Sequence, residues 1–219
     1  MSVVTPYYHL THLPLLDQCF IDEAVNSEYT WPSIDYEHNK PIIDSYVDDA
    51  THKKVDVVRG IPIPTPSRTK HGLPAEGERH KAPGRVIYAM SSFENTKFCQ
   101  DLSKDLGKVS TFYVYNQPWG LYDWHRDTGN FNSSINFLLS DIPGSKTVWK
   151  FPTDVKLHFR TSVLDYELYR PVLFNNQLDH SVLNLSNQHR YLLNISLLET
   201  TYKIAKEWLL DYKLADSYL

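Results

Sequence analysis

The second half of the chain alternates short apolar runs with polar turn residues. From about residue 110 to residue 198, runs rich in aromatic and β-branched residues are separated by turn-forming sequences such as Pro-Gly and Asn-Asn. Runs bounded by turns in this way are typical of antiparallel strands in a β-barrel or β-sandwich. The predicted strands are Thr111–Tyr115, Ser134–Leu139, Thr147–Phe151, Pro171–Phe174, Ser181–Leu185 and Tyr191–Leu198.

Apolar residues at helical spacing flank this block on both sides. Residues 15–28 predict a first helix, whose apolar positions are Leu16, Phe20, Ala24 and Val25. Residues 201–214 predict a last helix, whose apolar positions are Ile204, Trp208, Leu209 and Tyr212. Between them, Ser91 followed three residues later by Glu94 is a capping-box pattern, and it predicts a helix that ends at Gly107.

The length of 219 residues favours a single domain. A content of 42% hydrophobic and 22% charged residues is ordinary for a globular protein and excludes a disordered or fibrous class. We expect three parts: a helical and loop N-terminal part (1–110), a β-core (111–198) and a C-terminal helix (200–219). The predicted fold class is mostly β with flanking helices.

The segment from Arg59 to Arg85 is rich in proline and glycine, which makes regular structure improbable. It carries six Lys or Arg residues and two Glu residues, a net charge of +4 within a chain of net charge −4. Two interpretations stay open: a solvated connection, or a lid whose cations, Arg68 and Arg79 among them, meet an anionic substrate.

Charge and cysteine content narrow the classes of partner and compartment. A net charge of −4 argues against a general nucleic-acid binder. Cys19 and Cys99 lie too far apart for a zinc motif, which fits a reducing, cytoplasmic setting. The sequence shows no signal-peptide pattern, and no apolar run approaches the roughly 20 residues of a membrane span. We therefore expect a soluble protein without a membrane partner and leave its oligomeric state open.

Two histidines and a carboxylate form the pattern with the clearest chemistry. His125 and Asp127 are two residues apart, so on a strand or at its end both side chains face the same side. His180 opens a later predicted strand. Two His ligands and one carboxylate on one face of a metal ion are the facial triad of non-haem Fe(II) oxygenases, which leaves positions open for a cosubstrate and O₂. Arg190 opens the last strand pattern, where its guanidinium suits a distal carboxylate.

The residues around these positions resemble a known family. The segment from Tyr115 to Asp127, with Gly120 and Tyr122 inside it, is similar to the entry of the double-stranded β-helix in prolyl-hydroxylase-like Fe(II)/2-oxoglutarate-dependent oxygenases. Residues 173–184 are similar to the second-histidine strand of the aspartyl/asparaginyl hydroxylase branch. The resemblance covers about residues 111–198. It implies a double-stranded β-helix core, of the jelly-roll or cupin-like kind, packed by the N-terminal and C-terminal helices.

The same resemblance implies an activity: hydroxylation by O₂, with 2-oxoglutarate as cosubstrate and succinate and CO₂ released. An amino acid or peptidyl residue is the preferred substrate, because both similar branches act there. The implied Fe(II) ligands are His125, Asp127 and His180. The implied cosubstrate contacts are Arg190, for the C5 carboxylate, with Tyr115 and Asn136.

One departure from the family pattern concerns the cosubstrate contacts. Many members place Ser or Thr two residues after the arginine, where this chain has Leu192, so Tyr115 is expected as the substitute hydroxyl donor. Trp124 is a candidate wall of the substrate cavity. His189, which alternates to the other strand face from Arg190, is expected to be exposed.

Three alternative functions stay open. The first is a non-catalytic β-barrel binding module. The second is another metal enzyme on a cupin-like barrel, although such barrels usually supply a His-x-His pair that is absent here. The third is a 2-oxoglutarate oxygenase that acts on a nucleotide or a small anionic metabolite.

Overall fold

The alternating runs of the second half form eight consecutive strands. A computed structural model of the chain describes residues 5–26, 55–58, 61–64, 85–116, 121–127, 132–142, 145–152, 159–184, 186 and 188–212. The strands are β5 (Val109–Asn116), β6 (Leu121–His125), β7 (Ser133–Leu138), β8 (Ser145–Pro152), β9 (Phe159–Leu164), β10 (Pro171–Asn175), β11 (His180–Asn184) and β12 (Arg190–Leu197).

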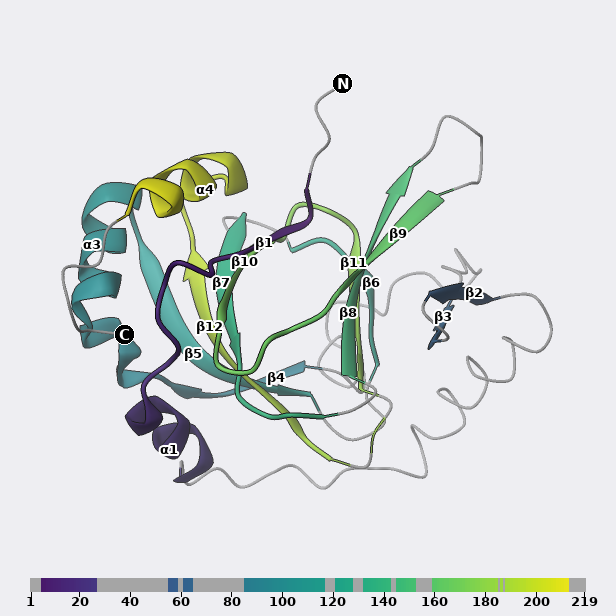
Figure 1. Cartoon of the computed structure of the whole chain (residues 1–219), viewed down its shortest axis with the longest axis horizontal. Helices are drawn as coiled ribbons and strands as arrows, with labels where there is room; N and C mark the ends of the chain where they lie inside the picture. Colours follow the sequence, from purple (N-terminus) through teal and green to yellow (C-terminus); the bar gives the residue numbers. More distant parts are fainter. Residues whose placement is uncertain are drawn as a thin grey trace, which may run out of the picture.

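These strands build two facing sheets (Figure 1). The larger has the order β1-β10-β7-β12-β5-β4 and the smaller the order β6-β11-β8-β9, with antiparallel neighbours throughout. Successive strands cross from one sheet to the other, except for β8 and β9, which form a hairpin within the smaller sheet. Eight strands wound in this way are a jelly roll, or double-stranded β-helix. The predicted fold class is confirmed.

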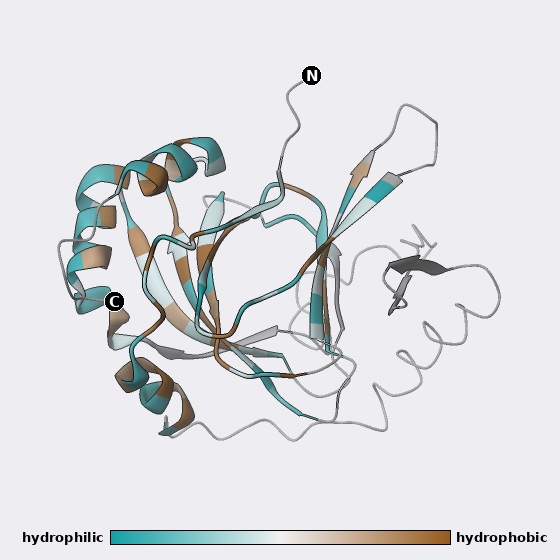
Figure 2. Cartoon of the chain, viewed as in Figure 1, coloured by the Kyte–Doolittle hydropathy of each residue, from teal (hydrophilic) through white to brown (hydrophobic). Residues whose placement is uncertain are grey.

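Helices cover the outer face of the larger sheet (Figure 1). They are α1 (Gln18–Asn26), α3 (Lys97–Leu106) and α4 (Tyr202–Asp211). Leu102 of α3 and Leu209 of α4 pack in one apolar cluster with Tyr113, Phe137 and Leu193, which are fully buried on the sheet. Figure 2 shows hydrophobic positions on these helices and on the strands that they cover. This outer layer is therefore the main hydrophobic core.

The inner face, between the two sheets, has a mixed character. Phe174 of β10 and Trp149 of β8 form one apolar cluster, and Val114 and Leu192 belong to another. Buried polar side chains share this inner face: Asn116, Asn136, Thr147, Asn194 and Arg190. Polar groups are costly to bury unless they are hydrogen-bonded. The polar side chains on this face therefore need hydrogen-bond partners, and apolar packing alone does not account for them.

The helix predicted from the capping box at Ser91 begins later than expected. Ser91 caps a short 3₁₀ helix, η2 (Ser92–Asn95), by accepting a hydrogen bond from the backbone N–H of Phe93 at 3.2 Å. The α-helix begins only at Lys97, where the Thr96 hydroxyl accepts from the N–H of Cys99. Its predicted end is correct: Gly107 has a φ of +88°, a conformation that glycine adopts without strain.

The first and last helices bury some of their predicted apolar positions, Ala24 and Leu209 among them, and expose others. In α1 the buried residues are Ile21 and Ala24, whereas Val25 is 72% exposed. In α4 the buried residues are Ala205 and Leu209, whereas the side chain of Ile204 is 51% exposed. Helical spacing alone did not distinguish the buried stripe from its neighbour because apolar residues occupy both.

The N-terminal part contains strands as well as helices and loops. β1 (Tyr7–His9) pairs with β10, and β4 (Arg85–Met90) pairs with β5, so each extends an edge of the larger sheet. β2 (Val55–Val58) and β3 (Ile61–Pro64) form a two-stranded ribbon. The expectation of irregular structure from Arg59 is therefore wrong for β3. Residues 65–84, with the lid candidates Arg68 and Arg79, lie outside the described residues.

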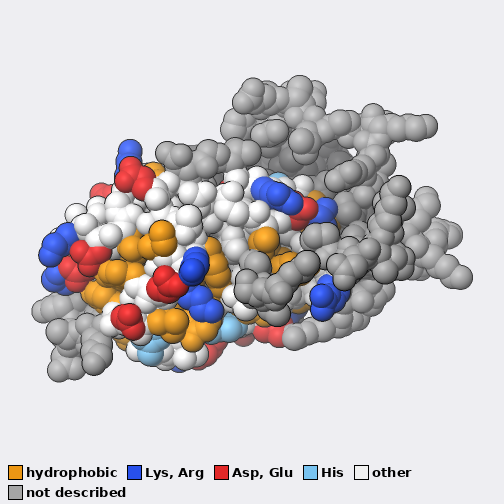
Figure 3. Space-filling model, turned by 90° about the horizontal axis from the view of Figure 1, so that it is seen from above, with side chains coloured by type: hydrophobic (Ala, Val, Ile, Leu, Met, Phe, Trp, Pro, Cys, Tyr) orange, Lys and Arg blue, Asp and Glu red, His pale blue; other side chains and the backbone are white. Residues whose placement is uncertain are grey.

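The surface of the described residues carries charges of both signs. On the face in Figure 3, acidic and basic side chains are interspersed among apolar patches. Among the helices in the part of the chain that the structure describes, none combines the length and apolar character needed to cross a bilayer.

Candidate metal centre

Adjacent strands of the smaller sheet bring the two histidines of the sequence pattern together. His125 is the last residue of β6, His180 is the first residue of β11, and the two are direct partners across the antiparallel pair. Their ring centroids lie 4.1 Å apart. Asp127 follows β6 by two residues, and its Oδ1 lies 3.6 Å from His125 Nε2. One potential ligand atom from each of the three residues lies within 4.8 Å of the other two.

A register shift in the β6–β11 pair accompanies this convergence. His180 pairs with His125, but Val182 pairs with Tyr122. The step of two residues from His180 to Val182 in β11 therefore lies opposite a step of three residues in β6, so β6 contains one extra residue here. An extra residue of this kind bends a strand and re-aims its side chains, and such irregularities are common next to functional sites. The shift places the end of β6, and with it His125, opposite the start of β11.

The ring of His180 is oriented for metal binding. Its Nδ1 lies 2.9 Å from the backbone oxygen of Leu178. A carbonyl oxygen only accepts hydrogen bonds, so Nδ1 carries the proton and donates it. The lone pair of a neutral imidazole is then on Nε2, which is the form that ligates a metal ion. The protein thus fixes both the tautomer and the direction of this candidate ligand.

The surroundings of the three side chains are apolar on one side and open on the other. Phe174 contacts the His180 ring edge-on with centroids 5.5 Å apart, and Trp149 lies 6.3 Å away. His180 is 3% exposed, whereas the side chains of His125 and Asp127 are 17% and 16% exposed. Two imidazoles and one carboxylate suit Fe(II), Mn(II) or a related divalent ion and leave further coordination positions open. These residues form a candidate metal site.

A cavity between the two sheets extends from this site. It is narrow, and the volume open to water-sized molecules is about 30 Å³. Asp127 and His180 line it at one end, and Arg190 lines it as well. Its remaining walls are polar and apolar residues of both sheets: Asn116, Ser134, Asn136, Thr147, Tyr166, Phe174, Asn176, Val182, Leu192 and Asn194.

Arg190 lines the cavity and is 1% exposed. Its guanidinium donates to Asn116 Oδ1 at 2.7 Å and to Thr147 Oγ1 at 3.4 Å, and it lies 5.1 Å from the centre of the Tyr166 ring. Thr147 is two residues from Trp149, the β8 partner of His180. Two residues along a strand span about 7 Å. The guanidinium therefore contacts β8 two residues away from the position that pairs with His180.

A chain of hydrogen bonds forms the floor of the cavity across β12 and β7. Asn194 Nδ2 donates to Asn136 Oδ1 at 2.6 Å, and Asn136 Nδ2 donates to Ser134 Oγ at 3.3 Å. Ser134 Oγ in turn donates to Asn176 Oδ1 at 3.2 Å. These bonds fix the orientation of each amide. The structure thus places Asn136, a predicted cosubstrate contact, in the cavity.

Three residues occupy positions other than those expected from the sequence. Tyr115 is fully buried on the helix-covered face of the larger sheet, because its neighbour Asn116 faces the cavity. Trp124 lies beneath Lys150, whose Nζ is 4.8 Å from the centre of its ring, and is not among the residues described as lining the cavity. His189 is half-buried against Tyr115 rather than exposed, and this burial lowers its pKa.

Sequence reasoning missed Asn116, Thr147 and Tyr166 around the guanidinium. Asn116 was within reach of the alternation rule, because Phe112, Val114 and Asn116 share the face opposite to Tyr113 and Tyr115. Thr147 and Tyr166 come from other strands and loops, and no local signal marks them. Such contacts depend on strand pairing, which the sequence alone left undetermined.

Comparison with models of known protein families and with curated proteins finds no match for this sequence. Among solved structures, the chain is similar to oxalate decarboxylase from Bacillus subtilis at pH 4.6, with a TM-score of 0.34 and 17% identity over 55% of this chain and 27% of that one. A serine-to-alanine mutant of the same enzyme gives a TM-score of 0.33 and 17% identity over 54% and 27%. The chain thus spans about a quarter of the length of these structures.

The strand order and the geometry of the side chains define the class. The protein is a double-stranded β-helix with a candidate metal centre of two histidines and one carboxylate.

Proposed function

We propose that this protein is an Fe(II)- and 2-oxoglutarate-dependent oxygenase. One observation supports the proposal above all others: His180 and Asp127, which belong to the candidate metal site, and the buried Arg190 line the same cavity. A metal site with open positions at one end and a guanidinium at the other matches the two functional ends of 2-oxoglutarate.

Each residue has a distinct task in this proposal. His125, Asp127 and His180 hold the metal ion, and Arg190 binds the C5 carboxylate through two parallel charge-assisted bonds. Asn116 and Thr147 accept hydrogen bonds from the guanidinium and restrain its position. When bound, the iron and cosubstrate supply the oxidising chemistry, and the protein supplies positioning and a dry, shaped cavity.

The hydroxyl contact that many family members supply two residues after the arginine is assigned here to Thr147. Leu192 occupies that place in β12 and contributes an apolar wall instead. The Thr147 hydroxyl is fully buried, lines the cavity and accepts a hydrogen bond from Arg190. It can therefore donate its own proton to a carboxylate that Arg190 binds.

The prime substrate is proposed to be an amino acid or a peptidyl residue that enters at the exposed side of His125 and Asp127. Arg68 and Arg79 are proposed to meet an anionic group of that substrate.

The test of this proposal is the formation of succinate from 2-oxoglutarate with Fe(II), ascorbate and O₂, with no prime substrate added. The wild-type protein is expected to form succinate. Asp127→Ala is expected to lose both metal binding and succinate formation, while Asp165→Ala, which removes an exposed carboxylate outside the cavity, leaves both unchanged.

Two results would contradict the proposal. If Asp127→Ala keeps normal turnover, Asp127 is not a ligand. If the wild-type protein binds metal and 2-oxoglutarate without any succinate, it is a binding module rather than an oxygenase.

A further inference from the structure

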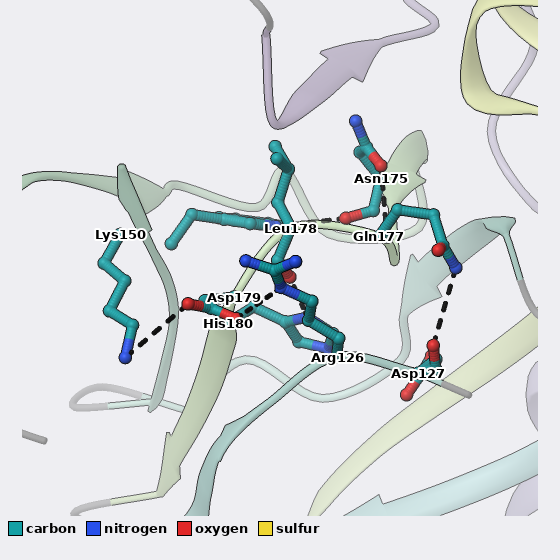
Figure 4. Close-up of polar contacts among 9 residues, drawn as sticks. Arg126, Asp127, Lys150, Asn175, Gln177, Leu178, Asp179 and His180 are labelled. Carbon is teal, nitrogen blue, oxygen red and sulfur yellow. Dashed lines mark hydrogen bonds and ion pairs between the residues drawn. The ribbon is translucent and has the colours of Figure 1, made fainter. Parts of the chain in front are cut away.

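A short turn contacts the chain segments of all the candidate ligands (Figure 4). It comprises residues 176–179, between the end of β10 at Asn175 and the start of β11 at His180. The backbone oxygen of Leu178 accepts from His180 Nδ1, and the backbone oxygen of Asn176 accepts from the N–H of Asp127 at 3.1 Å. Gln177 Nε2 donates to the backbone oxygen of Asp127 at 3.5 Å. The turn therefore holds the Asp127 backbone and the His180 ring at the same time.

One ion pair joins this turn to the other ligand segment through side chains. Arg126, which lies between His125 and Asp127, donates from Nε to Asp179 Oδ1 at 2.6 Å. Asp179 immediately precedes His180. Lys150 Nζ lies 3.7 Å from the second carboxylate oxygen of Asp179. The pair thus links two segments that are 53 residues apart in sequence and that carry all three candidate ligands.

We infer that Arg126 and Asp179 are positioning residues that set the affinity of the site for its metal ion. The inference rests on the proposed function for the existence of the metal site. Metal affinity depends on how closely the ligand side chains of the metal-free protein already match the bound geometry. Loss of a residue that hydrogen-bonds to a ligand typically lowers metal affinity by about 10- to 100-fold. Among the described residues, the Arg126–Asp179 pair is the one ion pair that joins the two segments carrying the candidate ligands. It can therefore restrain the backbone of both segments.

A second possible action of the pair is purely electrostatic, and the two actions predict opposite results at Arg126. Removing the positive charge of Arg126 strengthens the attraction of the site for a cation if charge alone matters. It weakens metal binding if the pair positions the ligands. Arg126→Gln is therefore the decisive variant, because its two possible effects differ in sign.

The experiment is a titration of the metal-free protein with Co(II), followed by the visible spectrum of the bound ion. Arg126→Gln is expected to weaken binding by about tenfold, within the range for such partners. Asp179→Asn, which also removes the contact with Lys150, is expected to weaken it at least as much. The double variant is expected to bind no more weakly than Asp179→Asn, because the pair is already lost.

The matched control is Asp165→Asn, which breaks the ion pair of Asp165 with Lys146 (3.6 Å) in the same sheet. It is expected to leave Co(II) affinity unchanged. Exposed ion pairs contribute little to folding, so the metal-free wild-type protein and the four variants, control included, are expected to have closely similar melting temperatures. A loss of affinity with an unchanged melting temperature separates positioning from a general loss of structure.

The outcomes distinguish this inference from the proposed function. Unchanged or tighter Co(II) binding by Arg126→Gln, or additive losses in the double variant, would overturn the inference and leave the oxygenase proposal standing if the wild-type protein still forms succinate. A wild-type protein that binds no divalent ion would overturn both.

Discussion

At the scale of single residues, the central feature is a buried arginine whose guanidinium is already oriented. Arg190 is 1% exposed and is held by Asn116 and Thr147 beside the Tyr166 ring. An arginine side chain loses considerable rotamer freedom on burial, and here that cost is met during folding rather than on binding. A carboxylate can therefore accept two parallel hydrogen bonds from a guanidinium that is already held in place.

Arg190→Lys tests whether this fork, and not charge alone, binds the cosubstrate. Lysine keeps the positive charge but loses the second parallel hydrogen bond, which contributes about 1.5–3 kcal/mol when one partner is charged. The KM for 2-oxoglutarate is expected to rise by about 10- to 100-fold in a succinate assay. Arg170→Lys, at a cation that pairs with Glu167 outside the cavity, is the control and is expected to keep the wild-type KM. An unchanged KM in Arg190→Lys would contradict the assignment.

His189 makes the stability of the folded protein depend on pH. Burial against the rings of Tyr115 and Tyr191 lowers its pKa below 6.5. Between the lowered pKa and 6.5 the unfolded chain binds more protons than the folded one, so stability falls as the pH drops below about 6.5 and is fully present above it. His189→Gln is expected to flatten this fall in urea unfolding between pH 7 and pH 5. Equal pH profiles for the variant and the wild-type protein would refute this.

At the scale of secondary-structure elements, strands with apolar residues on both faces were predictable, and polar or short strands were not. β5, β7, β8, β10, β11 and β12 coincide with the predicted runs to within a few residues. β6 and β9 were not predicted as strands, because Asp123 in the first and Arg160, Thr161 and Ser162 in the second interrupt the apolar pattern. Both belong to the smaller sheet, which has no helices packed on it among the described residues.

The start of α3 shows why helix boundaries needed the structure. The Ser91–Glu94 pattern fits a capping box, but the Ser91 hydroxyl caps η2, and Thr96 takes the cap of the longer helix. The Thr96 hydroxyl donates to the Phe93 oxygen at 2.8 Å while it accepts from the Cys99 N–H. One side chain thus ends η2 and begins α3.

Thr96→Ala is expected to lower the free energy of unfolding by about 1–2 kcal/mol, because it leaves the Cys99 N–H without its cap. Thr96→Ser keeps the hydroxyl and is expected to retain most of the stability. Chemical denaturation with both variants measures the difference. Equal losses in the two variants would show that the methyl group, rather than the cap, matters at this position.

At the scale of the whole molecule, the two faces of the larger sheet have different roles, and this difference explains how the site arises. The outer face packs against the helices and forms the main core, so the inner face is left to hold polar side chains. The sequence pattern indicated the β-core and the residues His125, Asp127, His180 and Arg190. Their convergence depends on strand pairings between distant parts of the chain, which only the three-dimensional structure supplies.

The central claim is that one cavity takes a metal ion at the His125, Asp127 and His180 end and a carboxylate at the Arg190 end. A crystal of the protein grown without O₂, with Mn(II) and 2-oxoglutarate, tests it through the anomalous signal of the metal. The account predicts one anomalous peak bounded by the two Nε2 atoms and the Asp127 carboxylate, with the distal carboxylate of the ligand paired to the Arg190 guanidinium. A metal peak elsewhere, or a ligand that leaves Arg190 uncontacted, would contradict it.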